Sequence, residues 1–500
     1  MNAHSGAVNL MKINSNFDTS SITPQIDQKP IANTQTPTIA ETFFNQPNSN
    51  IKDSRVSLRQ SELSIASSLL VEQLKKTSSL SSKTITTSNR NLVAPEKSVA
   101  FIRDFNGGLG LKPADLQEKQ KRMAESSFVL FRAMPSLFYK DIKGEFAASA
   151  KLLSRTAPNI VINGDMHIEN FGTFRGPDGK AVWGINDFDQ SDKGSPEWDL
   201  ERLATSAIFV ARQAGLGAEA EKALVSTITK KYVDTVKDIS QGKESATPYL
   251  SSEKSVGVIK DLVEKSSLEK RKKFLEKYTS IDNKGNYHFL SNDKLKPVSS
   301  DRASKVRSAL SSYEDQIGKD SGVAKPLRIL DVTEKLGSGG SSYGLPRYYA
   351  LVANDDPGKA PIILEVKALL PAPIKSPSST TGADGEKTVE RQQTLSSYTN
   401  PLVGSLKMDN RSFLVRELEP EKNTYTTDKI DNLSDATELF EQAAKVLARA
   451  HSQVSGQAEV ISNWIGKDEK TLTKRLTDFS RKYADQTEVV RQELAKQIEM

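Results

Sequence analysis

Cysteine is absent from the 500 residues of this chain. Its absence excludes disulfide bonds, thiolate zinc sites and cysteine nucleophiles. The sequence also lacks any apolar run of about 18 residues or more, and it does not begin with the basic-then-apolar order of a signal peptide. We therefore expect neither a membrane span nor Sec-dependent export.

The net charge of the chain is also small. The chain has 69 Lys and Arg against 63 Asp and Glu, a formal net charge of +6. So small an excess over this length does not predict a surface for nucleic acid or for an anionic membrane. We expect no nucleic-acid partner.

Histidine is scarce, with only His4, His167, His288 and His451 in the chain. The string Asp165-x-His167 matches the D-x-H of a two-metal phosphoesterase, but that class needs further His and Asn ligands that the sequence lacks. The apolar helical neighbourhood of His451 predicts a packing histidine.

Aromatic residues are few from residue 1 to 94, where Ser, Thr, Asn and Gln dominate. Such a segment buries too little apolar surface to offset its chain entropy, so we expect a disordered tail. Within it, Leu63, Ala66, Leu70 and Leu74 recur at helical spacing. This short helix either docks on the folded body or binds a chaperone of a type III or type IV secretion system. The protein is accordingly expected in the cytoplasm or in a host cell reached by such a system.

The remaining chain divides by pattern into four regions, 95–215, 216–326, 327–425 and 426–500. The second is charged and mainly helical apart from Tyr287–Leu290, and we interpret it as an insertion. The expected helices are 115–157, 196–213, 387–398 and those after Asp435, and the expected strands are 159–163, 181–185, 328–336, 347–353, 362–369 and 412–418.

Two of the early strands each lead into acidic residues. Asp165 and, five positions later, Asn170 follow the first strand, and Asp187 and Asp189 follow the second. Phosphoryl transfer needs such a set, with one carboxylate to accept the substrate hydroxyl proton and an amide and a carboxylate to hold Mg²⁺. We assign Asp165 as the base, with Asn170 and Asp187 as metal ligands.

The stretch containing GDMHIENFG, NDFDQ and PEWDLERLATS resembles the bacterial domain-of-unknown-function family 2252, over about Phe128 to Ser452. That family is related to the aminoglycoside phosphotransferase and choline kinase branch of the kinase-like superfamily. The resemblance implies that Asp189 lies near the metals and that Asp199 braces the catalytic loop. Arg202, one turn past Asp199, either pairs with it or lies on the surface. His167 is given a supporting role, and Asn163 stands where the branch usually has a histidine.

A nucleotide-covering part follows late in the chain. The glycine-rich turn between two expected strands contains Gly337, Gly339, Gly340, Ser341 and Gly344. Glycines let the backbone approach phosphates. Lys367 on a later strand would meet the α/β-phosphates, and Glu390 on the next helix would pair with Lys367. Arg416, Glu417 and Leu418 would line an adenine pocket.

These parts stand in reversed order for a kinase, so we expect an α+β, two-lobe kinase-like fold with permuted lobe order. The expected activity is Mg²⁺- and ATP-dependent phosphoryl transfer to a hydroxyl on a small molecule or a protein. A fold does not fix a reaction, so two alternatives stay open. One is adenylylation or glutamylation with ATP in a flipped pose, and the other is a non-catalytic nucleotide-binding effector.

Overall fold

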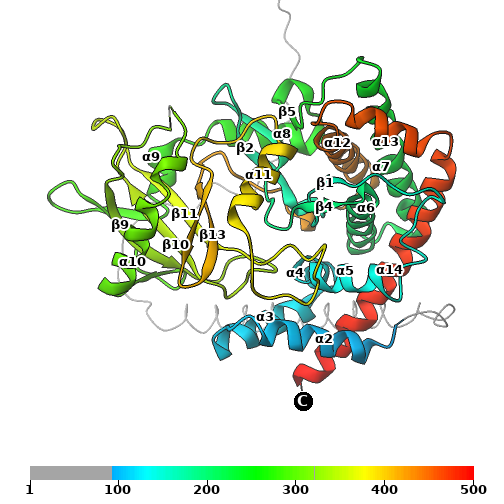
Figure 1. Cartoon of the computed structure of the whole chain (residues 1–500), viewed down its shortest axis with the longest axis horizontal. Helices are drawn as coiled ribbons and strands as arrows, with labels where there is room; N and C mark the ends of the chain where they lie inside the picture. Colours follow the sequence, from blue (N-terminus) through cyan, green and yellow to red (C-terminus); the bar gives the residue numbers. More distant parts are fainter. Residues whose placement is uncertain (1–92, 320, 500) are drawn as a thin grey trace, which may run out of the picture. The chain divides into compact units, whose positions relative to one another are not determined.

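The computed structural model describes residues 93–319 and 321–499. The predicted tail falls outside these residues apart from residues 93 and 94, and so does its helix around residues 63–74. The fold is mixed α+β, with antiparallel sheets and many helices (Figure 1). Within the described ranges, no helix is both long enough and apolar enough to cross a membrane.

The bounds of the elements are as follows. The helices are α2 (Pro95–Gly107), α3 (Pro113–Glu125), α4 (Ser127–Ala133), α5 (Pro135–Lys143), α6 (Pro196–Gln213), α7 (Gly217–Ser240), α8 (Gly257–Ser267), α9 (Arg271–Leu275), α10 (Ser300–Ser311), α11 (Gly385–Leu395), α12 (Leu433–His451), α13 (Gln457–Ile465) and α14 (Glu469–Glu499). The strands are β1 (Ile160–Ile162), β2 (Phe171–Arg175), β3 (Ala181–Ile185), β4 (Asp192–Gly194), β5 (Tyr249–Leu250), β6 (Thr279–Ile281), β7 (Tyr287–Phe289), β8 (Leu295–Pro297), β9 (Ile329–Lys335), β10 (Arg347–Val352), β11 (Ile362–Ala368), β12 (Gly404–Met408) and β13 (Arg411–Glu417).

The largest sheet has six antiparallel strands in the order β12-β13-β11-β10-β9-β8. A two-residue turn, Asp409-Asn410, joins β12 to β13, and both residues have positive φ, as the tightest hairpin turns require. Every residue of β10 and β11 is buried. Both faces of the sheet centre are therefore covered.

The side chains of β11 alternate between an apolar face and a charged face of the sheet. Leu364, Val366 and Ala368 enter an apolar cluster that also contains residues of α2, α3, α10 and α14. Glu365 and Lys367 are oriented to the other face because successive side chains on a strand alternate. The sheet thus presents charged side chains toward the rest of the molecule.

A second apolar core lies among α6, α7, α12 and α14 and extends under β1 and β3. These helices lie on the right in Figure 1, the large sheet on the left and α11 between them. The Ser195 hydroxyl accepts the Glu197 N–H and Pro196 fills the first turn, so α6 begins where the sequence predicts. Two small sheets, β1-β4 and β2-β3-β5, adjoin this core.

Most predicted elements are confirmed within a residue or two, including β3, β9, β10, β11, β13 and α6. The predicted helical run 115–157 is too long, because α5 ends at Lys143 and turns follow. Region 216–326 contains the expected strand at Tyr287–Phe289. It also contains β5, β6 and β8, which were not predicted, and β8 extends the large sheet beyond β9.

Candidate active site

Two loops carry the predicted acidic residues; α6 holds the first loop, and the two loops also contact each other. The Asp199 carboxylate accepts the N–H groups of Asn163 (2.8 Å) and Gly164 (2.9 Å), so it braces the first loop as expected. Gly164 has φ +82°, and a Cβ there would lie 2.2 Å from the Gln190 carbonyl oxygen. This position requires glycine because the two loops touch.

Asn163, the departure from the resembled branch, connects the two acidic loops. Its Nδ2 donates to the Asp187 carbonyl (2.7 Å), and its Oδ1 accepts the Asp165 N–H (3.1 Å). His451 is the predicted packing histidine, fully buried between the Asp199 carboxylate (3.0 Å) and the Tyr232 hydroxyl (2.8 Å). These contacts make the base of the site rigid.

Asp165 forms a buried ion pair with Arg202, whose guanidinium also lies 4.1 Å from the centre of the Phe131 ring. Both alternatives expected for Arg202, pairing with Asp199 and a place on the surface, are therefore wrong, since the residue has no exposed surface. Asp199 is already used by the loop amides and His451, which leaves Arg202 to turn toward Asp165. Burial raises the pKa of Asp165 to about 6, although the positive charge of Arg202 opposes that rise.

Asn170 and His167 both lie next to Asp165. Asn170 Nδ2 donates to the Asp165 carbonyl (2.7 Å). His167 Nε2 is 3.7 Å from Asp165 Oδ2, and its buried Nδ1 has no hydrogen-bond partner among the described residues. Burial and the charges of Arg132 and Arg202 hold the pKa of His167 well below its usual range, so the ring is neutral.

Lys367 joins the late part of the chain to the early part, as the sequence predicts. Its Nζ is 3.2 Å from Asp187 Oδ2 and also contacts the Asp189 carboxylate. Burial favours a neutral Asp187, but Lys367 and Arg416 outweigh it and hold its pKa below the usual range. Burial and the charge of Asp187 raise the pKa of Asp189, whose Oδ1 has no partner in the described structure.

A second row of charges beside Lys367 was only partly expected. Glu365 pairs with Arg347 (3.1 Å) and Arg416 (2.8 Å) across the sheet. Arg416 and Lys422 both donate to the Asn186 carbonyl, at 3.3 and 3.2 Å. Burial lowers the pKa of Lys422 to about 8. Strand alternation through β10 and β13 would have identified the two arginines, whereas Lys422 carries no sequence signal.

The glycine-rich turn connects β9 to β10 and is held from outside by α3. The buried Lys119 ammonium donates to the Ser341 carbonyl (2.5 Å), and the Arg122 guanidinium lies 4.7 Å from the centre of the Tyr343 ring. Gly344 packs on α3, where an added Cβ would lie 3.0 Å from Asp115 Cβ. The turn is thus fixed against the fold rather than free.

These segments enclose one polar cavity of about 270 Å³. Its lining combines both acidic loops, the glycine-rich turn and the charged sheet face: Arg132, Asp165, His167, Glu169, Asn170, Asn186, Asp187, Asp189, Gln190, Gly339, Gly340, Ser341, Ser342, Lys367, Arg416, Lys422 and Thr424. Gly337 and Gly344, both predicted to bind the nucleotide, do not line it. They shape the ends of the turn with φ of +65° and +81°.

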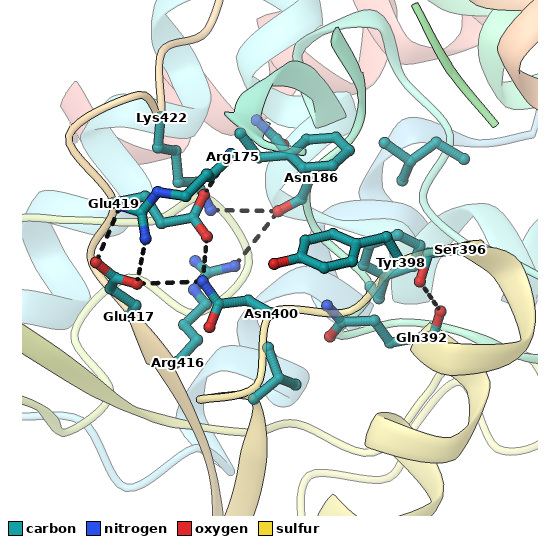
Figure 2. Close-up of a pocket in the computed structure, with 14 residues that line it drawn as sticks. Arg175, Asn186, Gln392, Ser396, Tyr398, Asn400, Arg416, Glu417, Glu419 and Lys422 are labelled. Carbon is teal, nitrogen blue, oxygen red and sulfur yellow. Dashed lines mark hydrogen bonds and ion pairs between the residues drawn. The ribbon is translucent and has the colours of Figure 1, made fainter. Parts of the chain in front are cut away.

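A second cavity adjoins the first and shares Asn186, Arg416 and Lys422 with it (Figure 2). Phe174, Ile185, Phe188, Tyr398 and Val403 give it an apolar part. Its polar lining is Arg175, Asn186, Gln392, Ser396, Asn400, Arg416, Glu417, Glu419 and Lys422.

Glu417 and Leu418, both predicted to bind the nucleotide, lie in different surroundings. Glu417 lines the second cavity, but its carboxylate is held by Arg175 (3.0 Å) and Arg271 (2.6 Å). Leu418 lines neither cavity, so its predicted place in an adenine pocket is wrong. Its amide donates to the Ile363 carbonyl (2.8 Å), and its side chain packs with the apolar cluster around Tyr349.

The predicted pairing of Glu390 with Lys367 is also wrong. Glu390 is exposed on α11 and forms no ion pair within the described part of the chain, whereas Lys367 contacts Asp187 and Asp189. Helix phase explains the difference, because Thr388 faces inward and the residue that shares its side is Arg391. Arg391 binds Asp192 (2.8 Å) and the Ser191 carbonyl (2.9 Å).

The side-chain oxygen atoms of the first cavity suit a divalent cation such as Mg²⁺ that also binds oxygen atoms of a ligand. Nowhere in the described structure do three or more His, Asp or Glu side chains gather as a complete metal site. Asp187, Asp189 and Asn170 nevertheless offer oxygen atoms to one cavity, and the unpartnered Asp189 Oδ1 is a buried acceptor. Mg²⁺ commonly takes one or two carboxylates and completes its shell with phosphates and water.

Fold and site together define a mixed α+β protein with a lysine–carboxylate cavity between an antiparallel sheet and two acidic loops. The chain belongs to the family described as "Uncharacterized protein conserved in bacteria (DUF2252)", which matches residues 111–496. The match is wider than the predicted similarity, which began near residue 128 and ended near 452. No curated protein and no solved structure matches the chain.

Proposed function

We propose that this protein is a Mg²⁺- and ATP-dependent phosphotransferase with a permuted, kinase-like arrangement of two lobes. The observation that carries the proposal is the contact of Lys367 with Asp187 and Asp189 in the cavity that also holds Asp165. An ammonium group, two carboxylates and a glycine-rich turn in one cavity are what binding of a metal-bound triphosphate requires.

The proposed division of the cavity follows the charges. The backbone of Gly339–Ser342 and the Lys367 ammonium would hold the phosphates, and Asp187, Asp189 and Asn170 would hold Mg²⁺. When bound, Mg²⁺ supplies positive charge to the phosphate oxygens. The second cavity would hold the base, because Phe174 and Tyr398 offer aromatic rings and Asn186 Nδ2 has no hydrogen-bond partner in the described structure. Asn186 and Tyr398 both line this cavity (Figure 2).

Asp165 is the proposed proton acceptor. Its pKa of about 6 leaves the carboxylate ionised at neutral pH, yet more basic than an exposed aspartate. In the proposed step the acceptor oxygen forms a bond to the γ-phosphorus, the bond from that phosphorus to the leaving ADP oxygen breaks, and the hydroxyl proton passes to Asp165. Arg202 holds the carboxylate in place and offsets the charge of its ionised form.

Two substitutions test this proposal. Asp187→Ala should abolish the Mg²⁺-dependent rise in Tm that ATP produces, because it removes a metal ligand and a Lys367 partner. Asp165→Ala should keep that rise and lose ATP turnover. A parental turnover rate in Asp165→Ala would show that the base is another group, and an unchanged Tm response in Asp187→Ala would contradict the metal site.

Adenylylation is the second candidate, and the position of Arg416 and Lys422 favours it. Both cations lie at the junction of the two cavities, so phosphates could also lie there in a reversed nucleotide pose. Intact-mass analysis of the products separates the candidates, since one adds a phosphate and the other adds AMP. ATP binding without any transfer product would instead support a non-catalytic effector.

A further inference from the structure

A third cavity, of about 500 Å³, lies at the N-terminal end of α6 and shares no lining residue with the two described above. Four separate segments contribute basic side chains to it: Lys143 at the end of α5, Lys151 and Arg155 in the following loop, Lys193 on β4, and Lys375 in the segment after β11. The fold therefore brings together in this cavity five basic residues from separate parts of the sequence.

The negative charge available to balance them is small. Glu197 is the one acidic residue that lines the cavity, and its carboxylate is buried. It accepts the N–H groups of Leu152 (2.9 Å) and Leu153 (3.2 Å) and the Ser195 hydroxyl (3.1 Å). Its oxygens are thus committed to the wall of the cavity rather than to the lysines.

Three of the lysines have no counter-charge in contact. Arg155 pairs with Asp468 and Lys375 with Asp192. Lys143, Lys151 and Lys193 form no ion pair with any described residue, and the Lys143 ammonium donates to the Lys375 carbonyl (3.2 Å). Like charges gathered in a hollow repel one another unless an anion lies between them.

An aromatic side chain shapes the cavity further. The first N–H groups of α6 are already taken, because Pro196 has none, the Ser195 hydroxyl accepts the Glu197 N–H and the Ser195 carbonyl accepts the Trp198 N–H, so the positive charge of the cavity comes from the basic side chains. The Trp198 ring also lines the cavity and packs on Gly194, where an added Cβ would lie 2.7 Å from a ring atom. The hollow therefore combines cations with an aromatic wall.

We infer that this cavity is a binding site for a small molecule that carries two or more phosphate groups. Three unpaired lysines around one hollow fit such a ligand, because phosphate oxygens take several charge-assisted hydrogen bonds at once. The inference stands on the third cavity alone and does not depend on the proposed phosphotransferase activity.

The site has a direct structural connection to the acidic loops. Lys193 on β4 pairs in register with Val161 on β1, and β1 leads into the loop that holds Asp165. Lys375 shares Asp192 with Arg391 of α11. An anion bound in the cavity would compete with Asp192 for the Lys375 ammonium. Binding of the anion would therefore change the charge around Asp192, which also joins α11 to β4 through Arg391.

Calorimetric titration with inorganic pyrophosphate in EDTA tests the inference. The parent should bind pyrophosphate, and the Lys151→Ala, Lys193→Ala double variant should bind it about tenfold more weakly or worse, because two charge-assisted contacts are lost. Both lysines are exposed, so the fold should tolerate their loss. Lys180→Ala, an exposed lysine in the turn between β2 and β3, is the matched control and should leave binding unchanged.

Lys367→Met separates this site from the catalytic cavity. If Lys367→Met removes pyrophosphate binding and the double variant keeps it, the anion binds in the catalytic cavity and the inference is overturned. Tryptophan fluorescence gives a second readout: pyrophosphate should change the emission of the parent but not of Trp198→Phe. An equal change in both proteins would contradict the assigned location.

Discussion

Asp165 shows how burial and a single partner set the chemistry of a carboxylate. The group is 6% exposed and lies against Arg202, which has no exposed surface. Burial raises the pKa to about 6, and Arg202 keeps it from rising further. The residue would therefore change its protonation state within an accessible pH range.

This gives a prediction for the pH dependence of turnover. A base must be deprotonated to work, so ATP turnover should be constant above a pH of about 6 and fall below it as Asp165 gains a proton. Asp165→Asn should lower turnover by roughly 10²- to 10⁴-fold at neutral pH, with nucleotide binding retained. A pH profile of kcat that stays flat down to pH 5 would contradict the assignment.

Lys367 lies next to the proposed position of the metal ion, because its ammonium contacts both Asp187 and Asp189. Lys367→Met leaves Asp187 and Asp189 together without their main counter-charge, which should cost about 3 kcal/mol of unfolding free energy. Mg²⁺ or Mn²⁺ without nucleotide should then raise the Tm of the variant more than that of the parent. Thermal denaturation with and without the metals measures both effects.

Lys359→Met is the matched control for this prediction, since Lys359 is an exposed lysine of the turn between β10 and β11. Its Tm and its response to metal should equal those of the parent. If Lys367→Met binds divalent cations no better than the parent, the ammonium does not hold the cation position.

At the scale of the element, α11 is attached to β4 by Arg391. This residue is next to Glu390, for which the sequence predicted an ion pair with Lys367. Arg391→Ala should lower the unfolding free energy by about 1–3 kcal/mol, because its contacts with Asp192 and the Ser191 carbonyl are largely shielded from solvent. Glu390→Ala, on the same helix, should change it by less than about 0.5 kcal/mol.

Hydrogen exchange gives the local measurement for the same pair. Amides of residues 385–395 should exchange faster in Arg391→Ala than in the parent and at the parental rate in Glu390→Ala. Equal exchange in the two variants would mean that α11 is held by its apolar contacts alone.

The strands also show which elements can be predicted from the sequence. β10, β11 and β13 were predictable because they are strands of six or seven residues with mainly apolar centres, while β2, β6 and β8 are short and polar or flanked by glycine and proline. Asp165 and Asp187 were found because each follows the end of a strand. The partner of Arg202 and the outward position of Glu390 were not, because helix phase and competition for one carboxylate depend on packing that the sequence does not state.

At the scale of the whole molecule, the predicted nucleotide-covering region shares its core with distant segments. The apolar cluster behind the large sheet combines β11 and β13 with Ile102 of α2, Met123 of α3 and Leu494 of α14. The sheet therefore has no complete core of its own.

This leads to a prediction about the proposed boundaries. Residues 327–425 produced alone should remain unfolded, because the face of β10 and β11 that packs on α2, α3 and α14 would be exposed to water. The parent should unfold in a single transition if α2–α5, the sheet and α14 form one cooperative unit. Circular dichroism during heating measures both. A cooperative transition in the isolated segment would show that it is an independent domain.

Asn163 has one further consequence for how the site would respond to its ligands. Its side-chain amide is bonded at one end to the backbone of Asp165 and at the other to the backbone of Asp187. This side chain thus links the residue proposed to take a proton to the residue proposed to hold a cation, beside the contact of Gly164 with Gln190. A shift of the Asp187 backbone on cation binding would therefore reach the backbone of Asp165 through that amide.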